Sequence, residues 1–214
     1  MPLVARYRSQ VEAFAEAALR PYLTTIRAPA WKAPSSKELN DCVWQTVVLR
    51  PLEVMVLDSP LLQRLRYVRQ LGVAHWTYPG AGHSRFEHSV GALHQIHRLI
   101  ESLSQKGLTT SNEALPSVPD LAMLNLMRLA ALCHDIGHGA MSHVVENAFK
   151  RLGTISELAI ELADELGVEE AKLSEAAACF LIGSPSFRAL RRRWGQRDRA
   201  IRARAWRGAR SRDA

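Results

Sequence analysis

The chain has 214 residues, of which 47% are hydrophobic, and a formal net charge of +7 at pH 7. This length suits one domain with appendages, and the hydrophobic fraction is sufficient for a buried core. Because no run of about eighteen uncharged apolar residues occurs, and because the three cysteines, Cys42, Cys133 and Cys179, form no CxxC pair, we predict neither a transmembrane helix nor a disulfide framework, and we expect a cytoplasmic location.

The first part of the chain predicts a helix, a linker and a strand. Residues 1–20 lack the long apolar block and the cleavage site of a secretory signal, so we interpret them as an amphipathic helix. Its apolar side carries Tyr7, Val11, Phe14 and Ala18. The stretch 27–39, with two Pro and two Ser, is typical of a linker. The Val- and Thr-rich stretch 42–51 predicts a strand or one arm of a β-hairpin.

Residues 57–72, LDSPLLQRLRYVRQLG, have the punctuation of a second helix. Asp58 or Ser59 can cap its start, and Gly72 can end it. Pro60 suits the first turn. Its apolar stripe consists of Leu61, Leu65, Val68 and either Leu62 or Leu71. The Pro-Gly-Ala-Gly run that follows predicts a loop over residues 75–85.

The second half of the chain predicts helices joined by loops. A helix is expected over about residues 86–103, a loop over 107–120, and then a helix capped by Asp120. One face of that helix carries Leu124, Met127, Ala131 and His134. Three more helices are expected over residues 144–152, 155–166 and 169–182. Because strands and helices do not alternate, we predict a mostly α protein with a short β-hairpin or strand near residues 42–50.

Seven of the eight histidines lie in two stretches, HSRFEHSVGALHQIHRL at residues 83–99 and LCHDIGHGAMSH at residues 132–143. On the first helix, His88 shares a face with Ala92, Ile96 and Leu99, and we predict that this face points to the core. On the second, His134 ends the apolar stripe, so both imidazoles are expected where the helices pack. Neutral imidazoles bind divalent transition metals, and Asp135 adds a carboxylate oxygen.

Two glycines are expected to break the helix after this His-Asp pair and to let two more histidines reach the same place; these residues are Gly137, Gly139, His138 and His143. A single buried His is more often a core residue with one hydrogen bond than a ligand, and this interpretation is kept for His75, His94 and His97. It fits the others poorly, because a buried Asp135 between apolar residues is costly without a cation or hydrogen bonds.

These residues resemble the HD superfamily of metal-dependent phosphohydrolases, and within it the deoxynucleoside triphosphate triphosphohydrolase branch. Three motifs carry the resemblance in the same order, SPLLQRLRYVRQLG, YPGAGHSRFEHSVG and LCHDIGHGAMSHVVE, within a stretch from about Glu38 to Phe149. The resemblance implies an HD-domain helical bundle, a nucleotide substrate and a divalent metal ion. The sequence does not distinguish Mn, Fe, Mg, Zn and Ni.

The resemblance also implies roles for single residues. The metal ligands would be His88, His134 and Asp135. The substrate contacts would be Arg85 at the phosphates and Gln70 at the sugar. The catalytic residues would be His138 and His143, which lie against the phosphate under attack, and Glu146, which positions the catalytic His and stands where the family has Asp. For Arg85, the alternative is a surface ion pair with Glu87 or Glu146.

Two parts of the family's site are not identifiable in this sequence. The second Asp ligand has three candidates after His143, none in an apolar context: Asp164, Asp198 and Asp213. Where the family has a later His-Glu pair, Ser174 precedes Glu175. We therefore expect nucleotide phosphohydrolase activity that is strongly impaired in this form. The alternative is an inactive HD remnant that binds nucleotide or nucleic acid without turnover.

The positive charge of the chain is concentrated in its last 27 residues. Residues 188–214 carry eleven Arg and two Asp, whereas the other 187 residues carry 17 Lys or Arg and 19 Asp or Glu. We interpret this tail as a truncated or frameshifted end, and the alternative is a basic tail that binds nucleic acid. The expected organisation is an N-terminal helix and linker (1–37), a partial HD domain (38–187) and the tail (188–214). A homo-oligomer is expected and a membrane partner is not.

Overall fold

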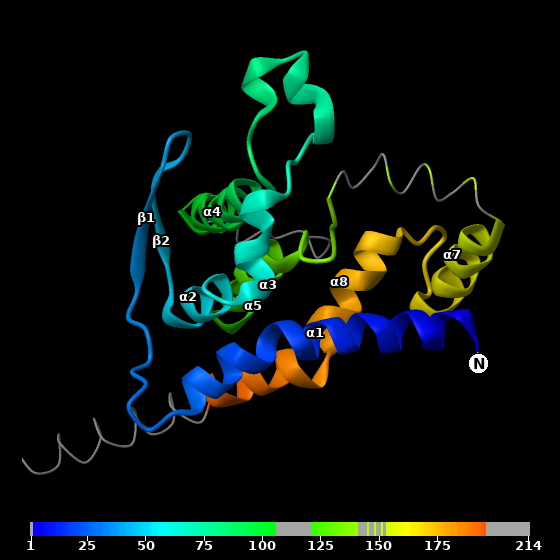
Figure 1. Ribbon diagram of the computed structural model, residues 1–214. Coiled ribbons are helices and arrows are strands. Elements are labelled where there is room, and N and C mark those ends of the chain that lie inside the picture. Colours follow the sequence, from blue (N-terminus) through cyan, green and yellow to red (C-terminus); the bar gives the residue numbers. More distant parts are fainter. Residues whose placement is uncertain are drawn as a thin grey trace, which may run out of the picture.

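The computed structural model describes residues 2–105, 121–140, 145, 148, 151 and 153–195 (Figure 1). These residues are mainly α-helical, with one two-stranded antiparallel sheet, which confirms the predicted fold class. The helices and strands are α1 (Leu3–Arg27), β1 (Lys37–Asp41), β2 (Gln45–Leu49), α2 (Pro51–Leu57), α3 (Pro60–Gln63), η1 (Arg64–Tyr67), η2 (Gly72–Trp76), η3 (Pro79–Ala81), α4 (Arg85–Gln105), α5 (Leu121–Cys133), α7 (Gly153–Leu166) and α8 (Leu173–Gly183). Residues 185–195 are also helical.

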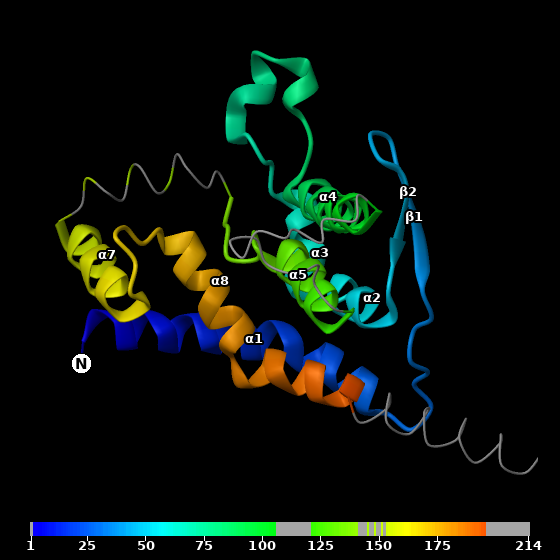
Figure 2. The same ribbon diagram turned by 180° about the vertical axis from the view of Figure 1, so that it is seen from behind.

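Helix α1 is the long base of the molecule, and α7 and α8 lie across its N-terminal half (Figures 1 and 2). Its buried face consists of Val4, Ala15, Leu19, Leu23 and Ile26. The predicted apolar side is rotated from this face, because Phe14 is 48% exposed and its ring lies 5.7 Å from the guanidinium carbon of Arg64. The amphipathic helix itself was predicted correctly.

Strands β1 and β2 form the expected hairpin, with Lys37 opposite Leu49 and Asp41 opposite Gln45. Its second strand buries Val47 and Leu49, which alternate as in a half-buried strand. The Asp41 carboxylate accepts hydrogen bonds from the backbone N–H groups of Val43 and Trp44, at 2.8 and 2.9 Å. The side chain of Asp41 therefore holds the turn, which explains why the sequence between the strands can reverse direction.

The single helix predicted over residues 57–72 is wrong. Helix α3 ends at Gln63, a 3₁₀ turn follows, and Val68 is extended with φ −107° and ψ 110°. The backbone then pairs with the segment before α4: Arg85 N donates to Val68 O at 2.8 Å, and Gln70 N donates to His83 O at 3.1 Å. These long-range bonds replace helical ones, so residues 68–84 project from the body of the molecule (Figure 1).

Helices α4 and α5 pack against each other in the core, but not through the predicted face of α4. The buried face carries Phe86, Val90, Leu93 and Ile100. The face of His88 turns away from it, and Leu99 on that face is 54% exposed. The prediction that this face points to the core was therefore wrong. The face instead brings His88 to the edge of the core, where a side chain can meet both the protein and solvent.

The C-terminal helical residues pack on the core as well. Leu190 is fully buried, and Arg193 Nε donates to the carbonyl of Ile26 at 3.1 Å. The boundary expected after residue 187 falls inside this helix, so packed structure continues to residue 195. The expected loop 107–120, most of the expected helix 144–152, and residues 196–214 lie outside the described residues.

Within the described ranges, no helix is both long enough and apolar enough to cross a membrane.

Candidate metal centre

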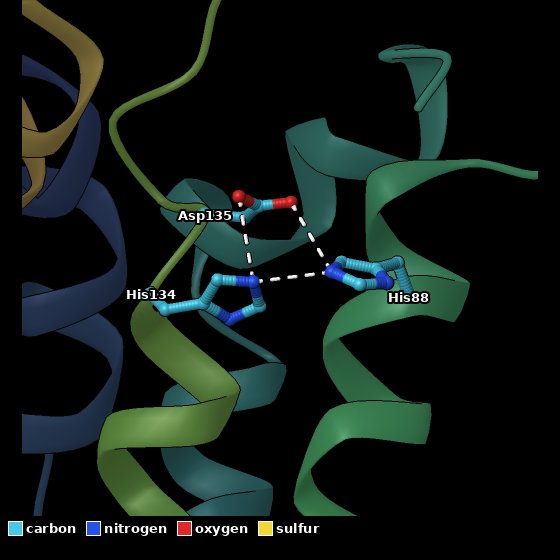
Figure 3. Close-up of side chains that lie close together, drawn as sticks. All are labelled: His88, His134 and Asp135. Atoms are coloured by element: carbon cyan, nitrogen blue, oxygen red, sulfur yellow. Dashed lines mark hydrogen bonds and ion pairs between the residues drawn. The ribbon is translucent and has the colours of Figure 1, made fainter. Parts of the chain in front are cut away.

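Three potential metal ligands converge from two helices (Figure 3). His88 lies in the first turn of α4, and His134 and Asp135 follow the last residue of α5. The Nε2 atoms of the two histidines are 3.1 Å apart. The Asp135 carboxylate oxygens lie 3.9 Å from His88 Nε2 and 3.5 Å from His134 Nε2. The sequence prediction that these three side chains meet agrees with this arrangement.

The separations of 3.1 and 3.5 Å are close to those expected around one bound cation, and the 3.9 Å separation is longer. Two ligand atoms at about 2.1 Å from a metal, with an angle of about 90° to 110° between them, are about 3.0 to 3.4 Å apart. His134 Nδ1 lies 2.8 Å from the carbonyl oxygen of Ala131, a bond that places the ring proton on Nδ1. The lone pair of His134 is then on Nε2, which faces the other two ligands. Backbone contacts of this kind commonly orient the histidines of metal sites.

The electrostatics of His88 favour its neutral, metal-binding form. Partial burial lowers its pKa below the ordinary 6.5; Asp135 opposes this shift, and His134 adds to it. The side chains of His88 and His134 remain 40% and 41% exposed. Their nitrogens are therefore available to an ion and to a substrate that arrive from solvent.

Arg85 is the ion-pair partner of Asp135. Its Nη1 lies 2.7 Å from Asp135 Oδ2, and its side chain is 1% exposed. This pairing differs from the alternative considered above, a surface ion pair with Glu87 or Glu146. Glu87 instead caps α4, because its carboxylate accepts bonds from Ser84 N and Oγ, which lower the pKa of Glu87. Arg85 Nε and Nη2 are buried without a hydrogen-bond partner among the described residues.

His138 contacts the carboxylate oxygen of Asp135 that Arg85 does not contact. Its Nε2 is 3.4 Å from Asp135 Oδ1, and the residue is 8% exposed. Arg64 holds the loop that carries it: Nη1 donates to His138 O at 2.7 Å, and Nη2 donates to Ile136 O. Arg64 was not identified as a site residue from the sequence. In the sequence, Arg64 stands out only because it lies off the apolar stripe predicted for residues 57–72. That position does not reveal a hydrogen-bond partner 74 residues away.

Gly137 allows this loop to lie directly on α8. A Cβ at Gly137 would be 2.0 Å from the carbonyl oxygen of Ser174 and 2.5 Å from the backbone nitrogen of Ala178. At Gly139, no atom of the described residues lies within 4 Å of such a position. The two glycines of the motif therefore have different functions, and only the first is required for close packing.

The remaining predicted site residues are less closely connected to this centre. Gln70 is half-buried, and its Oε1 has no hydrogen-bond partner among the residues described. His143 and Glu146 lie outside the described residues. In the described part of the chain, the cluster has three ligands, and the candidate Asp164 is exposed on α7.

The three histidines interpreted as ordinary residues lie elsewhere. His75 Nδ1 contacts the carbonyl of Gly72 at 3.0 Å, and His97 pairs with Glu101 at 3.4 Å. The His94 ring lies 6.0 Å from that of Trp44. Within the described residues, none of the three belongs to the metal cluster.

Comparison with known proteins agrees with this site. The HD domain model matches residues 85–205, more than half of the chain. The deoxynucleoside triphosphate triphosphohydrolase SAMHD1 of Xenopus laevis is 36% identical over 132 residues, which cover 61% of this chain and 20% of that protein. SAMHD1 of Homo sapiens is 39% identical over 113 residues, covering 53% and 17%. The SAMHD1 homolog of Dictyostelium discoideum is 32% identical over 123 residues, covering 56% and 22%.

The chain thus spans about a fifth of the length of these curated relatives. All three ligands of the cluster lie inside the range that the family model matches, and the cluster can hold a divalent metal ion. The extent of this match shows that the chain belongs to the HD domain family.

Proposed function

We propose that this protein is a metal-dependent phosphohydrolase that acts on nucleotides, with a deoxynucleoside triphosphate as its substrate. The observation that supports this proposal most directly is the convergence of His88, His134 and Asp135 beside a buried arginine and a third imidazole. The substrate class is that of the similar deoxynucleoside triphosphate triphosphohydrolases SAMHD1. The specific reaction that we propose is hydrolysis that releases triphosphate from the nucleotide.

The residues of the chain divide the chemistry between them. His88, His134 and Asp135 would hold the metal ion, which when bound polarises a phosphoryl oxygen and increases the acidity of water. Arg85 Nε and Nη2 are buried without a hydrogen-bond partner among the described residues, and their N–H groups can stabilise charge that develops on phosphate oxygens. His138 is held beside Asp135 and can transfer a proton to the leaving oxygen.

Three further roles belong to this proposal on the resemblance alone. Gln70 would contact the sugar, His143 would contact the phosphate under attack, and Glu146 would orient a catalytic His. We also propose that the protein acts in the cytoplasm and forms a homo-oligomer. The three cysteines are free, which supports the cytoplasmic location.

A second function is favoured by the incomplete ligand set. The cluster of described residues supplies three protein ligands, and a carboxylate from a later helix is not among them. An ion held by fewer ligands dissociates more easily. The second candidate is therefore an HD domain that binds metal and nucleotide but turns the substrate over slowly or not at all.

Metal analysis of the purified full chain is the first test. After loading with Mn²⁺ and removal of free ion, we expect about one ion per chain in the wild type. The His134→Ala and Asp135→Asn variants should retain little, because each lacks one of three ligands. The matched control is His97→Ala, which changes a histidine of α4 outside the cluster. Equal metal content in the wild type and in His134→Ala would contradict the proposed site.

Product release is the second test. Incubation with deoxynucleoside triphosphates and Mn²⁺ should release triphosphate, and His138→Gln should reduce the rate at least about a hundredfold while leaving metal content unchanged. A wild type that binds metal and nucleotide without release of any phosphate would support the second function. Release that is unaffected by both Asp135→Asn and His138→Gln would place the chemistry at other residues.

A further inference from the structure

A cavity of about 480 Å³ lies next to the metal centre, between α1, the loop 137–140, α7 and α8. Figures 1 and 2 show how α7 and α8 both rest on the N-terminal half of α1. The apolar walls of the cavity include Leu3, Leu158 and Leu173, and its polar lining includes Arg6, Gln10 and His138. Volume and lining are those of a small-molecule site, for which about 300–1,000 Å³ and mainly apolar walls are usual.

His138 connects this cavity with the metal centre. It lines the cavity, and its Nε2 is 3.4 Å from an oxygen of the metal ligand Asp135. A molecule with its phosphates at the metal cluster can therefore place its other end in the cavity while it remains in contact with His138. The cavity therefore adjoins the place at which we propose that the phosphates bind.

The N-terminal part of α1 is held firmly against the cavity. Tyr7 donates its hydroxyl hydrogen bond to Leu173 O at 2.8 Å, and Val4 N donates to a carboxylate oxygen of Glu161 at 3.3 Å. These bonds attach α1 to α8 and to α7. Because the backbone on both sides of residue 6 is fixed in this way, side chains of this turn occupy defined positions at the cavity.

Two neighbouring arginines of α1 have different surroundings. Arg8 pairs with Glu165, and its guanidinium carbon lies 4.6 Å from the centre of the Phe180 ring. Arg6 is exposed, lines the cavity and has no ion pair within the described part of the chain. Gln10, one turn later, is also exposed and lines the cavity. Their amide and guanidinium groups are available to a ligand.

We propose that this cavity receives the base of the nucleotide, and that Arg6 and Gln10 of α1 determine specificity for it. The inference rests on the proposed function, because it assumes that the phosphates are held at the metal centre. Leucine side chains from three helices suit the faces of a flat heterocycle. Gln10 can donate to and accept from the edge of a base, and Arg6 can donate to its carbonyl and ring-nitrogen acceptors.

Binding to two ligands that share the same phosphates tests this assignment. The full chain, loaded with Mn²⁺, is titrated by calorimetry with inorganic tripolyphosphate and with a deoxyadenosine triphosphate analogue whose 5′ oxygen is replaced by a methylene group, so that its triphosphate cannot be released. We expect the nucleotide to bind at least about tenfold more tightly than tripolyphosphate. The double variant Arg6→Ala, Gln10→Ala should lose most of this preference and bind tripolyphosphate as the wild type does.

Two further variants control for folding and charge. Arg20→Ala removes an exposed arginine of the same helix that pairs with Glu16 at 3.4 Å, and it should behave as the wild type. Leu3→Trp narrows the cavity without removing charge, and it should weaken only the nucleotide. This variant keeps the inference testable if the double variant does not fold.

The outcomes separate this inference from the proposed function. Equal affinity of the wild type for both ligands would overturn the role of the cavity and leave the metal centre as proposed. A double variant that weakens both ligands equally would place Arg6 at the phosphates and also overturn the inference. If neither ligand binds to metal-loaded wild type, the proposed function itself fails, and the inference fails with it.

Discussion

Asp135 is the residue on which the metal centre depends, because it contacts four side chains. Its carboxylate is buried and faces Arg85, His138 and the two histidine ligands. A buried carboxylate is costly unless cations or hydrogen bonds compensate for lost water. Arg85 supplies one positive charge from within the protein, and a bound metal ion would supply more. The buried Asp135 carboxylate, which directly follows α5, is therefore suited to bind a cation.

Cys133, in contrast with the charged residues of the site, is a titratable residue buried without a charged partner among the described residues that would favour its ionised form. Cys133 precedes His134 directly but points into the apolar core, and burial raises its pKa to about 12. A thiol with such a pKa is almost entirely protonated at neutral pH and reacts slowly. Cys42 and Cys179 are exposed.

We therefore expect two of the three thiols to react quickly with a disulfide reagent at pH 8 in the native protein. The third should react only when denaturant exposes Cys133. Absorbance of the released thiolate measures the number of reacted groups. The variant Cys133→Ala should show the same fast phase as the wild type. Rapid reaction of all three thiols in the native protein would show that the end of α5 is open to solvent.

At the level of elements, the contact between the loop after α5 and helix α8 positions His138. Arg64 ties this loop to η1 through the carbonyls of Ile136 and His138. On its other side, Gly137 lies against the backbone of α8. His138 is thus held between two elements, which gives its imidazole a defined position beside Asp135.

Gly137→Ala should destabilise the protein by about 3 kcal/mol, the upper part of the usual range for overpacking. The reason is that the new methyl group would lie 2.0 Å from the Ser174 carbonyl oxygen, a backbone atom that can move only with α8. The matched control is Gly139→Ala, where no atom of the described residues lies within 4 Å of the new methyl group. Urea unfolding monitored by circular dichroism measures both. Equal stability of the two variants would mean that α8 does not pack on this loop.

On the scale of the whole molecule, α1 at the start of the chain packs against the helices at the C-terminal end of the described residues. Its C-terminal half packs in the main core with α3 and with the helical residues 185–195, and its N-terminal half packs with α7 and α8 in a second apolar cluster. Ser186 donates to Glu16, and Arg193 donates to Ile26. Helices far apart in sequence thus enclose the cavity beside the metal centre.

Leu190 tests how far packed structure extends toward the C-terminus. It is fully buried in the main core, so Leu190→Ala should lower the free energy of unfolding by about 2–5 kcal/mol. Arg192→Ala, at an exposed position of the same helix, should change it by less than about 0.5 kcal/mol. Thermal melts of both variants against the wild type give the comparison. A melting temperature unchanged by Leu190→Ala would return the domain boundary to residue 187.

Much of this protein was accessible from local sequence. Apolar spacing and turn residues predicted α1, the hairpin, α4, α5, α7 and α8, because these patterns express which face of one element is apolar. The metal ligands were also accessible, since a histidine followed by an aspartate at the end of an apolar helix is difficult to explain by packing. The His134-Asp135 signal is local, whereas His88 lies 46 residues before His134.

Tertiary structure decided the rest, because it depends on partners that are distant in sequence. The broken helix 57–72 follows from backbone bonds between Val68 and Arg85, and local propensity did not reveal them. The buried pair of Arg85 with Asp135 spans 50 residues. The face of α4 that is buried was set by what packs against it, not by its apolar spacing alone. The chemical groups of the site were therefore determined by the sequence, whereas their mutual positions were determined by packing between elements.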